Sequence, residues 1–291
     1  MPDFTFLQNA LSGQWISLAP RRQDRPNIAK ATEPTVCPFC VGRETDEEEI
    51  YRIGGEPGDA NWQVRVLPNK YPFAPHHEII IHSPDHHKNI DELPTDAVQL
   101  ILQAYKARFL AHVNEGTVYI FHNHGIEGGE SLPHPHSQLV VVPHEVTLQI
   151  PKLEPLPKES VTTSDFFIFC PTVSQWPDEV WIAPKNSGSN FGQITDAQIA
   201  DLAIVLQRVI QLLDIRHGHE FPFNFYIAPG DNWYIRLIPR IKRLGGFELG
   251  TNVYVNTQDP AETIAFIKEH FENPDVEKIE QENRAAYAKA V

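Results

Sequence analysis

The sequence contains one structural pattern twice, and this repeat constrains the fold more than any other feature. Residues 78–81 predict a short strand, and a helix follows from Thr95 to Leu110. Residues 179–182 predict another strand, and a second helix follows from Thr195 to Leu213. Each helix opens on Thr-Asp-Ala, in which the threonine suits the N-cap and the aspartate suits the first turn. We therefore expect a duplicated unit built around one helix.

Strands are also predicted after each helix. They lie at residues 118–121 and 138–142 in the first copy, and at 224–227 and 233–238 in the second. Several strands around one helix favour an α+β unit with a mostly antiparallel sheet. Two such units could pair their sheets or pack back to back.

The boundary between the two units is predicted in the Pro- and Lys-rich stretch 151–158. It divides the chain into domains 1–155 and 156–291, and the end of the second, residues 276–291, predicts a charged helix. The second copy has no histidine in residues 230–236, where the first copy has a His-x-His. We therefore expect one catalytic half and one supporting half.

Composition excludes several classes of protein. The formal net charge of −14 argues against a nucleic-acid-binding protein, which needs a basic surface. No apolar run approaches the ~20 residues of a membrane helix, and the N-terminus resembles no export signal. The 3 cysteines do not form a disulfide framework. These features predict a cytoplasmic protein without a membrane segment.

The segment 131–138 carries the densest group of reactive side chains, and it leads into residues 139–142, an apolar run typical of a buried strand. Alternate residues of a strand share a face, so His134, His136 and Gln138 are expected side by side. Two prolines in this segment cannot donate to a ladder, which puts the histidines at a strand entrance or an edge. Such a group indicates a metal site, catalysis or both.

His136 can attack phosphorus if an acceptor holds its second ring nitrogen and fixes the tautomer. A metal on His134 would hold the neighbouring backbone, and Gln138 could donate to the phosphate under attack. The alternative is a metal hydrolase in which His134 and His136 are both ligands. That enzyme would need a carboxylate base nearby.

Cys37 and Cys40 form a Cys-x-x-Cys motif, which places two thiolates on a tight turn suited to zinc. The chain has no second such motif, so the other ligands would be histidines or carboxylates, with His86 and His134 as candidates. A redox pair would need a strand-to-helix context, which the sequence after Val36 lacks. A packing role is the third alternative.

Two further features are suited to an anion. Residues 125–131 are Gly-rich, and their N–H groups could form an anion nest or simply close a hairpin. Arg22 and Arg25 supply cations that suit phosphate oxygens, or they lie on a solvated surface. His122 and His124 are interpreted either as groups behind the active site or as surface residues.

Four motifs in register resemble the galactose-1-phosphate uridylyltransferase family of the histidine-triad superfamily. They are Cys37-Pro-Phe-Cys40, Asn69-Lys-Tyr-Pro72, Ser83-Pro-Asp-His86 and Ser131-Leu-Pro-His134-Pro-His136-Ser-Gln138. The resemblance covers most of the chain. It implies an α+β fold made of a tandem pair of histidine-triad-like domains, with mostly antiparallel sheets and packed helices.

Carried over by motif, the resemblance implies a role for each of these residues. It implies a structural Zn²⁺ held by Cys37, Cys40, His86 and His134, catalysis by His136 and Gln138, and substrate contacts from Arg22, Arg25, Asn69, Asn123 and Ser131. The implied mechanism is ping-pong: the nucleophilic histidine takes a nucleoside monophosphate from a nucleotide sugar and passes it to a phosphorylated acceptor. Neither phosphate needs a general acid or base, because the second pKa of a phosphate is about 6.

The implied function is a nucleotidyltransferase of the UDP-glucose–hexose-1-phosphate uridylyltransferase type, active in galactose metabolism on nucleotide sugars and sugar 1-phosphates. The family also implies a homodimer with a shared site. The chain departs from the usual pattern at Ser137, where the family has glycine, and in the missing second-half histidines. Residues 240–251 resemble the branch that includes plant ADP-glucose phosphorylase. The alternatives are therefore an ADP-sugar or dinucleoside-polyphosphate phosphorylase, or a nucleotide-binding zinc protein or metal hydrolase.

Overall fold

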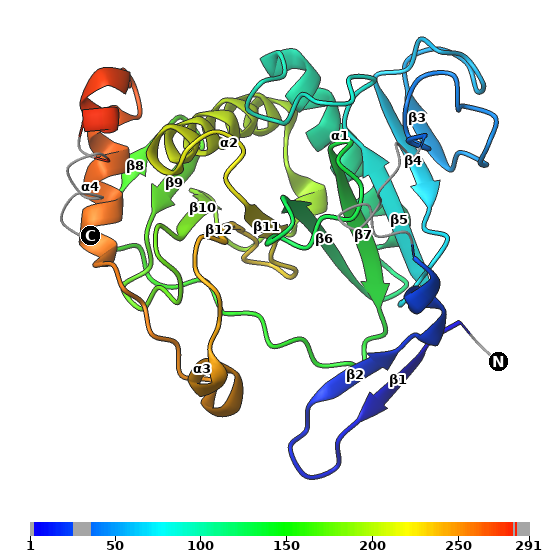
Figure 1. Ribbon diagram of the computed structural model, residues 1–291, viewed down its shortest axis with the longest axis horizontal. Helices are drawn as coiled ribbons and strands as arrows, with labels where there is room; N and C mark the ends of the chain where they lie inside the picture. Colours follow the sequence, from blue (N-terminus) through cyan, green and yellow to red (C-terminus); the bar gives the residue numbers. More distant parts are fainter. Residues whose placement is uncertain (1–2, 26–35, 282, 284–291) are drawn as a thin grey trace.

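The computed structural model describes residues 3–25, 36–281 and 283 (Figure 1). Its elements, in chain order, are β1 (Thr5–Gln8), β2 (Trp15–Leu18), the 3-10 helix η1 (Pro20–Asp24), β3 (Tyr51–Ile53), β4 (Val64–Pro68), β5 (His76–Ile81), α1 (Thr95–His112), β6 (Thr117–His124), β7 (His136–Val142), β8 (Val161–Thr162), β9 (Phe166–Phe169), β10 (Val180–Pro184), the 3-10 helix η3 (Phe191–Gln193), α2 (Asp196–His217), β11 (Phe223–Ile227), β12 (Ile235–Pro239), α3 (Gly246–Thr251) and α4 (Pro260–His270).

The predicted α+β character with a mainly antiparallel sheet is confirmed. Within the described residues, ten strands form one sheet in the order β3-β4-β5-β7-β6-β11-β12-β10-β9-β8. Every neighbouring pair in this sheet is antiparallel. The strands and helices expected from the repeat are present, with ends that differ by a few residues.

The two halves of the chain join edge to edge in this sheet. The joint is the antiparallel pair β6–β11, in which Asn123 lies opposite Asn224. Outward from this joint the strands of the two halves follow the same order, with β7, β5 and β4 on one side and β12, β10 and β9 on the other. Because one sheet runs through both halves, the division into two domains at residue 155 stays a prediction.

Helices α1 and α2 contact each other and cover one face of the sheet (Figure 1). Their apolar stripes and the strand residues beneath them form the largest hydrophobic core, with Ile101 and Tyr105 from α1 and Leu202 and Leu206 from α2 fully buried. Burying such side chains contributes roughly 1.5–3 kcal/mol each. This packing buries one face of the sheet under the helices, and the opposite face is left uncovered by α1 and α2.

The two helix starts differ, and one predicted cap is wrong. Thr195 caps α2 as expected: its side chain accepts a hydrogen bond from the N–H of Gln198. Thr95 is instead the first residue of α1, because Pro94 holds the N-cap position. Its hydroxyl donates to Oε1 of Gln207 at 2.8 Å and so ties α1 to α2.

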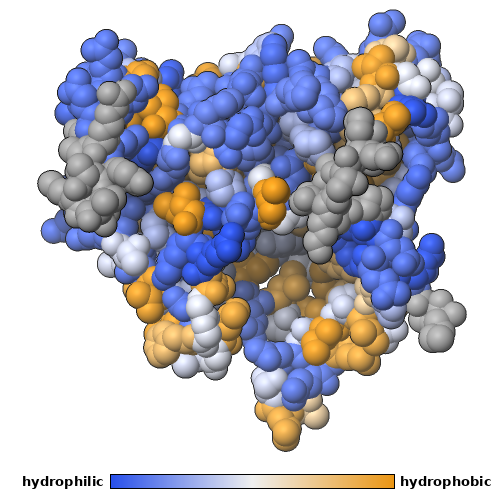
Figure 2. All heavy atoms as spheres, viewed as in Figure 1, coloured by the Kyte–Doolittle hydropathy of each residue, from blue (hydrophilic) through white to orange (hydrophobic). Residues whose placement is uncertain are grey.

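The ends of the chain add smaller features. The β1–β2 hairpin forms a separate two-stranded sheet. Figure 2 shows apolar side chains gathered around a hollow between this hairpin and α3. Residues 276–281 are helical as predicted, whereas the predicted helix beyond residue 283 lies outside the described residues. No helix among the described residues is long and apolar enough to cross a bilayer.

The Gly-rich loop between β6 and β7 depends on close backbone packing at one position. A Cβ on Gly128 would lie 2.1 Å from the carbonyl oxygen of His124 and 2.9 Å from that of Phe223. The Gly128 carbonyl also accepts a hydrogen bond from Nδ2 of Asn224 at 2.7 Å. The loop that leads to the His-x-His is therefore anchored at the joint between the two halves.

We expect Gly128→Ala to lower the free energy of unfolding by about 1–3 kcal/mol, since the added methyl group must displace backbone. Gly246→Ala is the matched control, because nothing lies within 4 Å of a Cβ at Gly246. Urea denaturation of both variants measures the difference. Equal midpoints for the two variants would show that the loop is not held as described.

Candidate functional site

The four predicted zinc ligands come together in the structure. The ligand atoms of Cys37, Cys40, His86 and His134 all lie within 4.8 Å of one another. Nδ1 of His86 is 3.1 Å from Sγ of Cys40, and Nδ1 of His134 is 3.8 and 3.7 Å from the two sulfurs. In a tetrahedral zinc site, sulfur and nitrogen ligands are roughly 3.5 Å apart. The donor set and its spacing therefore fit zinc.

The hydrogen bonding of His134 supports a metal ligand. Its Nε2–H donates to the carbonyl oxygen of Ser83 at 2.8 Å, which leaves the Nδ1 lone pair facing the sulfurs. A ligating histidine commonly has its other ring nitrogen held in this way. Burial also raises the pKa of Cys37 to about 11, so the thiolate needs a nearby cation to form at neutral pH. A zinc ion here would cross-link three segments: the Cys37–Cys40 turn, called the knuckle below, the loop after β5 that carries His86, and the entrance to β7 that carries His134.

His136 is the first residue of β7 and is 5% exposed. Its Nδ1–H donates to the carbonyl oxygen of His134 at 2.8 Å, so the lone pair lies on Nε2. Burial lowers the pKa of His136 to about 4, which keeps the imidazole neutral at physiological pH. A neutral imidazole with a fixed tautomer is the form that acts as a nucleophile.

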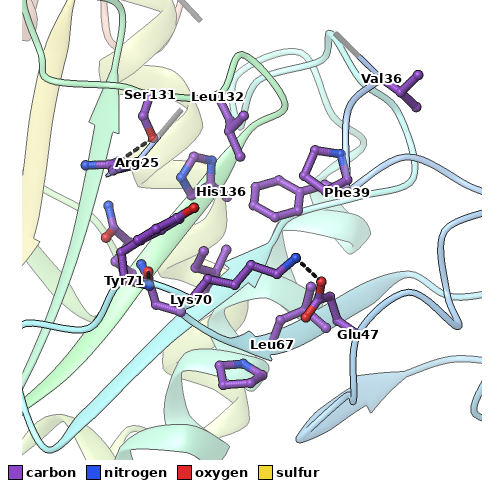
Figure 3. Close-up of a pocket in the computed structure, with 15 residues that line it drawn as sticks. Arg25, Val36, Phe39, Glu47, Leu67, Lys70, Tyr71, Ser131, Leu132 and His136 are labelled. Atoms are coloured by element: carbon purple, nitrogen blue, oxygen red, sulfur yellow. Dashed lines mark hydrogen bonds and ion pairs between the residues drawn. The ribbon is translucent and has the colours of Figure 1, made fainter. Parts of the chain in front are cut away.

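Phe39 connects the knuckle to this histidine. It lies inside the Cys-x-x-Cys turn, and its ring makes edge contacts with both imidazoles, at 6.1 Å from His134 and 5.3 Å from His136. Figure 3 shows the Phe39 ring beside His136 at the wall of a pocket. The Cys-x-x-Cys turn thus also supplies an apolar wall beside His136.

Gln138 shares the face of His136, as the alternation of β7 predicts. Its Oε1 accepts a hydrogen bond from Nε2 of His77 at 2.9 Å, which leaves the amide nitrogen to donate elsewhere. Nδ2 of Asn69 lies 3.1 Å from the same His77 nitrogen, and Oδ1 of Asn69 accepts from the N–H of Tyr71. Asn69 and Gln138 therefore both lie against Nε2 of His77, but the proton that this nitrogen donates to Gln138 leaves it no lone pair for Asn69.

The cavity in front of these residues has a volume of ≈ 320 Å³. Arg25, Asn69, Ser131, His136 and Gln138 all line it. The Arg25 guanidinium donates to the Ser131 hydroxyl, and Figure 3 shows this pair on the opposite side of His136 from Phe39. A cation, a hydroxyl and an amide beside a neutral imidazole suit a phosphate.

Arg22 and Asn123 lie outside the lining of this cavity. Arg22 donates to the carbonyl oxygen of Tyr71 at 2.6 Å, and its guanidinium stacks on Phe73. Asn123 lines a second cavity of ≈ 550 Å³ on the same open face of the sheet. Its Oδ1 accepts from Asn224, whose own Oδ1 accepts from Arg240 at 2.8 Å. Of the five predicted substrate residues, three thus line the first cavity, Asn123 lines the second, and Arg22 lines neither.

Ser137, where the family has glycine, points to the helix-covered face of the sheet and contacts three side chains there. Its hydroxyl contacts Nε2 of His82 at 2.8 Å, the hydroxyl of Tyr105, and Nδ1 of His122 at 3.2 Å. His122 also donates to the carbonyl oxygen of His136 at 3.0 Å. The interpretation of His122 as a surface residue is therefore wrong, because it is buried behind the reactive histidine.

His124 is also buried, against Glu220, whose carboxylate lies 3.1 Å from its Nε2. In the second half, β10 and β12 correspond to β5 and β7; Glu179 lies directly before β10, and Arg236 lies in β12. These two side chains form a buried ion pair, with Nε of Arg236 2.6 Å from the carboxylate. The second half therefore has a structural ion pair in the part of the repeat where the first half has imidazoles.

Sequence reasoning did not find His77 or His82. Both lie on β5 or directly after it, and their alternation with Ile79 and Ile81 places them on opposite faces. That alternation was readable in the sequence, but the partners across β7 and α1 were not. Arg240 was likewise predicted only as part of the segment 240–251, and its stacking on Trp176 beside the second cavity depends on the fold.

Residues 74–145 match the family model of the galactose-1-phosphate uridyl transferase N-terminal domain. The chain thus resembles the galactose-1-phosphate uridylyltransferase family in this segment. It is 26% identical to ADP-glucose phosphorylase of Arabidopsis thaliana over 324 residues, covering 90% of this chain and 92% of that protein. It is 25% identical to galactose-1-phosphate uridylyltransferase of Thermotoga maritima over 310 residues, covering 90% and 96%. The resemblance stated from the motifs is confirmed.

Solved structures show the same fold. The crystal structure of the Arabidopsis thaliana ADP-glucose phosphorylase with bound ADP-glucose superposes with a TM-score of 0.70 at 24% identity, covering 91% of this chain and 99% of that chain. A uridylyltransferase structure superposes with a TM-score of 0.71 at 22% identity, covering 91% and 97%. That uridylyltransferase and the plant enzyme therefore share one fold with this chain.

We expect the purified protein to contain about one zinc ion per chain at the knuckle. Cys37→Ser removes one thiolate and should abolish this zinc. Cys170→Ser is the control, because Cys170 is a buried cysteine outside the cluster. Metal analysis after dialysis measures the stoichiometry. A wild-type protein that folds normally and takes up no zinc would contradict the assignment.

The free energy of unfolding should fall as the pH drops from about 6.5 toward 4. Burial lowers the pKa of His77 and His136 to about 4, and it also lowers the pKa of His82 and His122 well below the usual value. The unfolded chain binds these protons near pH 6.5 and the folded chain does not, so the stabilisation present above 6.5 is lost on acidification.

Each such histidine contributes up to about 1.4 kcal/mol per pH unit in that window. Urea midpoints at pH 7 and pH 5 measure the effect, and His77→Gln should reduce the difference between them. A wild-type midpoint that does not change between these two pH values would show that the histidines are not kept neutral by burial.

Proposed function

We propose that this chain is a nucleotidyltransferase that moves a nucleoside monophosphate between phosphorylated sugars through a covalent nucleotidyl-histidine at His136. The observation that carries the proposal is the hydrogen bond from Nδ1 of His136 to the carbonyl oxygen of His134. This bond holds the proton on Nδ1 and so leaves the lone pair on Nε2 available to attack phosphorus. Burial, which lowers the pKa of His136 to about 4, keeps that lone pair free.

In the first half-reaction, Nε2 of His136 attacks the α-phosphorus of a nucleotide sugar. The new P–N bond replaces the bond from the α-phosphorus to the bridging oxygen, and sugar 1-phosphate leaves with the electron pair. Positive charge develops on the imidazole, and the His134 carbonyl oxygen that accepts from Nδ1–H stabilises it. No general acid is required, because the leaving group is a phosphate.

The neighbouring donors suit the equatorial oxygens of the phosphate under attack. Gln138 can donate through its amide nitrogen, since its Oε1 is bound by His77. Arg25 and Ser131 line the same cavity and supply a cation and a hydroxyl. Preorganised donors of this kind are worth about 10²–10³ in rate each when they face the developing charge.

In the second half-reaction, a phosphate oxygen of the acceptor attacks the same phosphorus, and the P–N bond breaks. We propose a sugar 1-phosphate as acceptor and UDP-glucose as donor, as in the uridylyltransferases that the chain resembles. The second candidate is a phosphorylase that uses an ADP-sugar and inorganic phosphate. The similarity to the plant ADP-glucose phosphorylase over 90% of this chain favours it. The homodimer stays a prediction.

The experiment is a labelling reaction without acceptor. We expect α-³²P-labelled UDP-glucose or ADP-glucose to leave acid-labile, base-stable label on the wild-type protein. His136→Asn should lose this label completely, because the nucleophile is absent. His144→Asn is the control, since His144 is an exposed histidine outside the site.

Adding an acceptor to the labelled protein then distinguishes the two functions. Release of label as UDP-sugar by galactose 1-phosphate supports the transferase, whereas release as ADP by inorganic phosphate supports the phosphorylase. Label that persists in His136→Asn would move the nucleophile elsewhere. Absence of label from both donors on zinc-replete protein would refute nucleotidyl transfer.

A further inference from the structure

A second group of metal-type side chains lies far along β5 from the Cys-x-x-Cys knuckle. His76 is the first residue of β5, whereas the knuckle ligand His86 follows the other end of that strand. His112 is the last residue of α1, and Glu115 lies in the turn before β6. The ligand atoms of His76, His112 and Glu115 all lie within 4.8 Å of one another. The catalytic proposal uses none of these three residues.

Both imidazoles of this group approach the same carboxylate oxygen of Glu115. Nε2 of His76 is 2.6 Å from Oε2 of Glu115, and Nδ1 of His112 is 3.1 Å from the same oxygen. The two imidazole rings lie with their centroids 4.4 Å apart. Ligands at 2.0–2.2 Å from a tetrahedral zinc ion are roughly 3.3 Å apart. A small outward movement of the Glu115 carboxylate would therefore make room for the ion.

His112 is oriented by a carboxylate on its other side. Its Nε2 lies 2.7 Å from Oε1 of Glu78, a buried residue of β5. Glu78 is itself held by Arg108, which donates to both carboxylate oxygens at 2.8 and 2.6 Å. This contact turns Nδ1 of His112 toward His76 and Glu115. A carboxylate that fixes a ligating histidine in this way is typical of metal sites.

The local charges favour a cation. Glu78 and Arg108 offset each other, and Glu115 adds a negative charge beside two imidazoles. The whole chain carries a formal net charge of −14. The side chains of His76 and Glu115 are 43% and 44% exposed, so an ion can reach the site and water can complete its coordination.

We propose that His76, His112 and Glu115 form a second metal site that binds a divalent first-row ion, with zinc as the representative case. Two imidazoles, one carboxylate and an open position are a ligand set used by zinc. The ion would join the start of β5 to the end of α1, on the face of the sheet that α1 covers. The site is independent of the proposed catalysis at His136, so either proposal can fail alone.

The experiment measures zinc bound by the full chain in equilibrium dialysis against buffered free Zn²⁺. We expect about two zinc ions per wild-type chain, one at the knuckle and one weaker ion at the new site. Glu115→Gln and His76→Asn change exposed side chains, so both variants should fold. Each should lower the affinity of the weaker site at least about tenfold while the tighter ion stays.

His219→Asn is the matched control. His219 is an exposed histidine with Nδ1 3.4 Å from the carboxylate of Asp214, but it belongs to no group of three ligands among the described residues. This variant should bind zinc as the wild type does. Cobalt provides a second readout, because the weaker site should give visible d–d bands without the thiolate-to-metal charge transfer that a cysteine ligand produces.

Three results would overturn the proposal. They are a wild-type chain that binds only the knuckle ion, variants of Glu115 and His76 that keep both ions, or a His219 variant that loses the weaker ion equally. The first would mean that the three side chains form only a hydrogen-bonded His–Glu contact. The third would mean that the weaker binding is non-specific adsorption to surface histidines.

Discussion

Two hydrogen bonds to backbone carbonyls orient the side chains of the site. Their donors are two histidines that lie only two residues apart in the chain. His134 donates from Nε2 to Ser83, and His136 donates from Nδ1 to His134. The opposite ring nitrogen is left free in each case, so one lone pair faces the cysteines and the other faces the cavity. The same residue type is thus suited to two proposed roles, metal ligand and nucleophile, because the local backbone selects two tautomers. The pairing of β5 with β7 makes the first bond possible, since it brings Ser83 beside the strand entrance, whereas the second bond is local to the His-x-His segment.

Much of the fold was predictable because its determinants are local. The apolar spacing of the two helices, the alternating strands and the Thr195 cap are properties of a few consecutive residues. The Thr95 cap failed because Pro94 competes for the same position, and the benefit of the threonine comes instead from Gln207 on another helix. The edge-to-edge joining of the halves was left open, since it depends on which strand edges meet.

The parts of the site that were predictable are those in which sequence spacing alone fixes the relative positions of the side chains. The Cys37–Cys40 turn and the alternation of His136 and Gln138 follow from spacing alone. The contacts of His77 with Gln138 and Asn69, and the separation of Arg22 and Asn123 from the main cavity, depend on register between strands distant in sequence. The same holds for the group of His76, His112 and Glu115, which joins the start of a strand to the end of a helix.

Ser137 has an evolutionary consequence. Its hydroxyl is the common partner of His82, Tyr105 and His122 on the buried side of β7. A glycine there, as in the usual family motif, would remove that shared partner, whereas His82 and Tyr105 would keep their own contact at 3.0 Å and His122 would keep its bond to the His136 carbonyl oxygen. The effect of any one of these four residues therefore depends on the other three. An exchange of Ser137 for glycine is therefore coupled to changes at the other three positions but is not excluded by them.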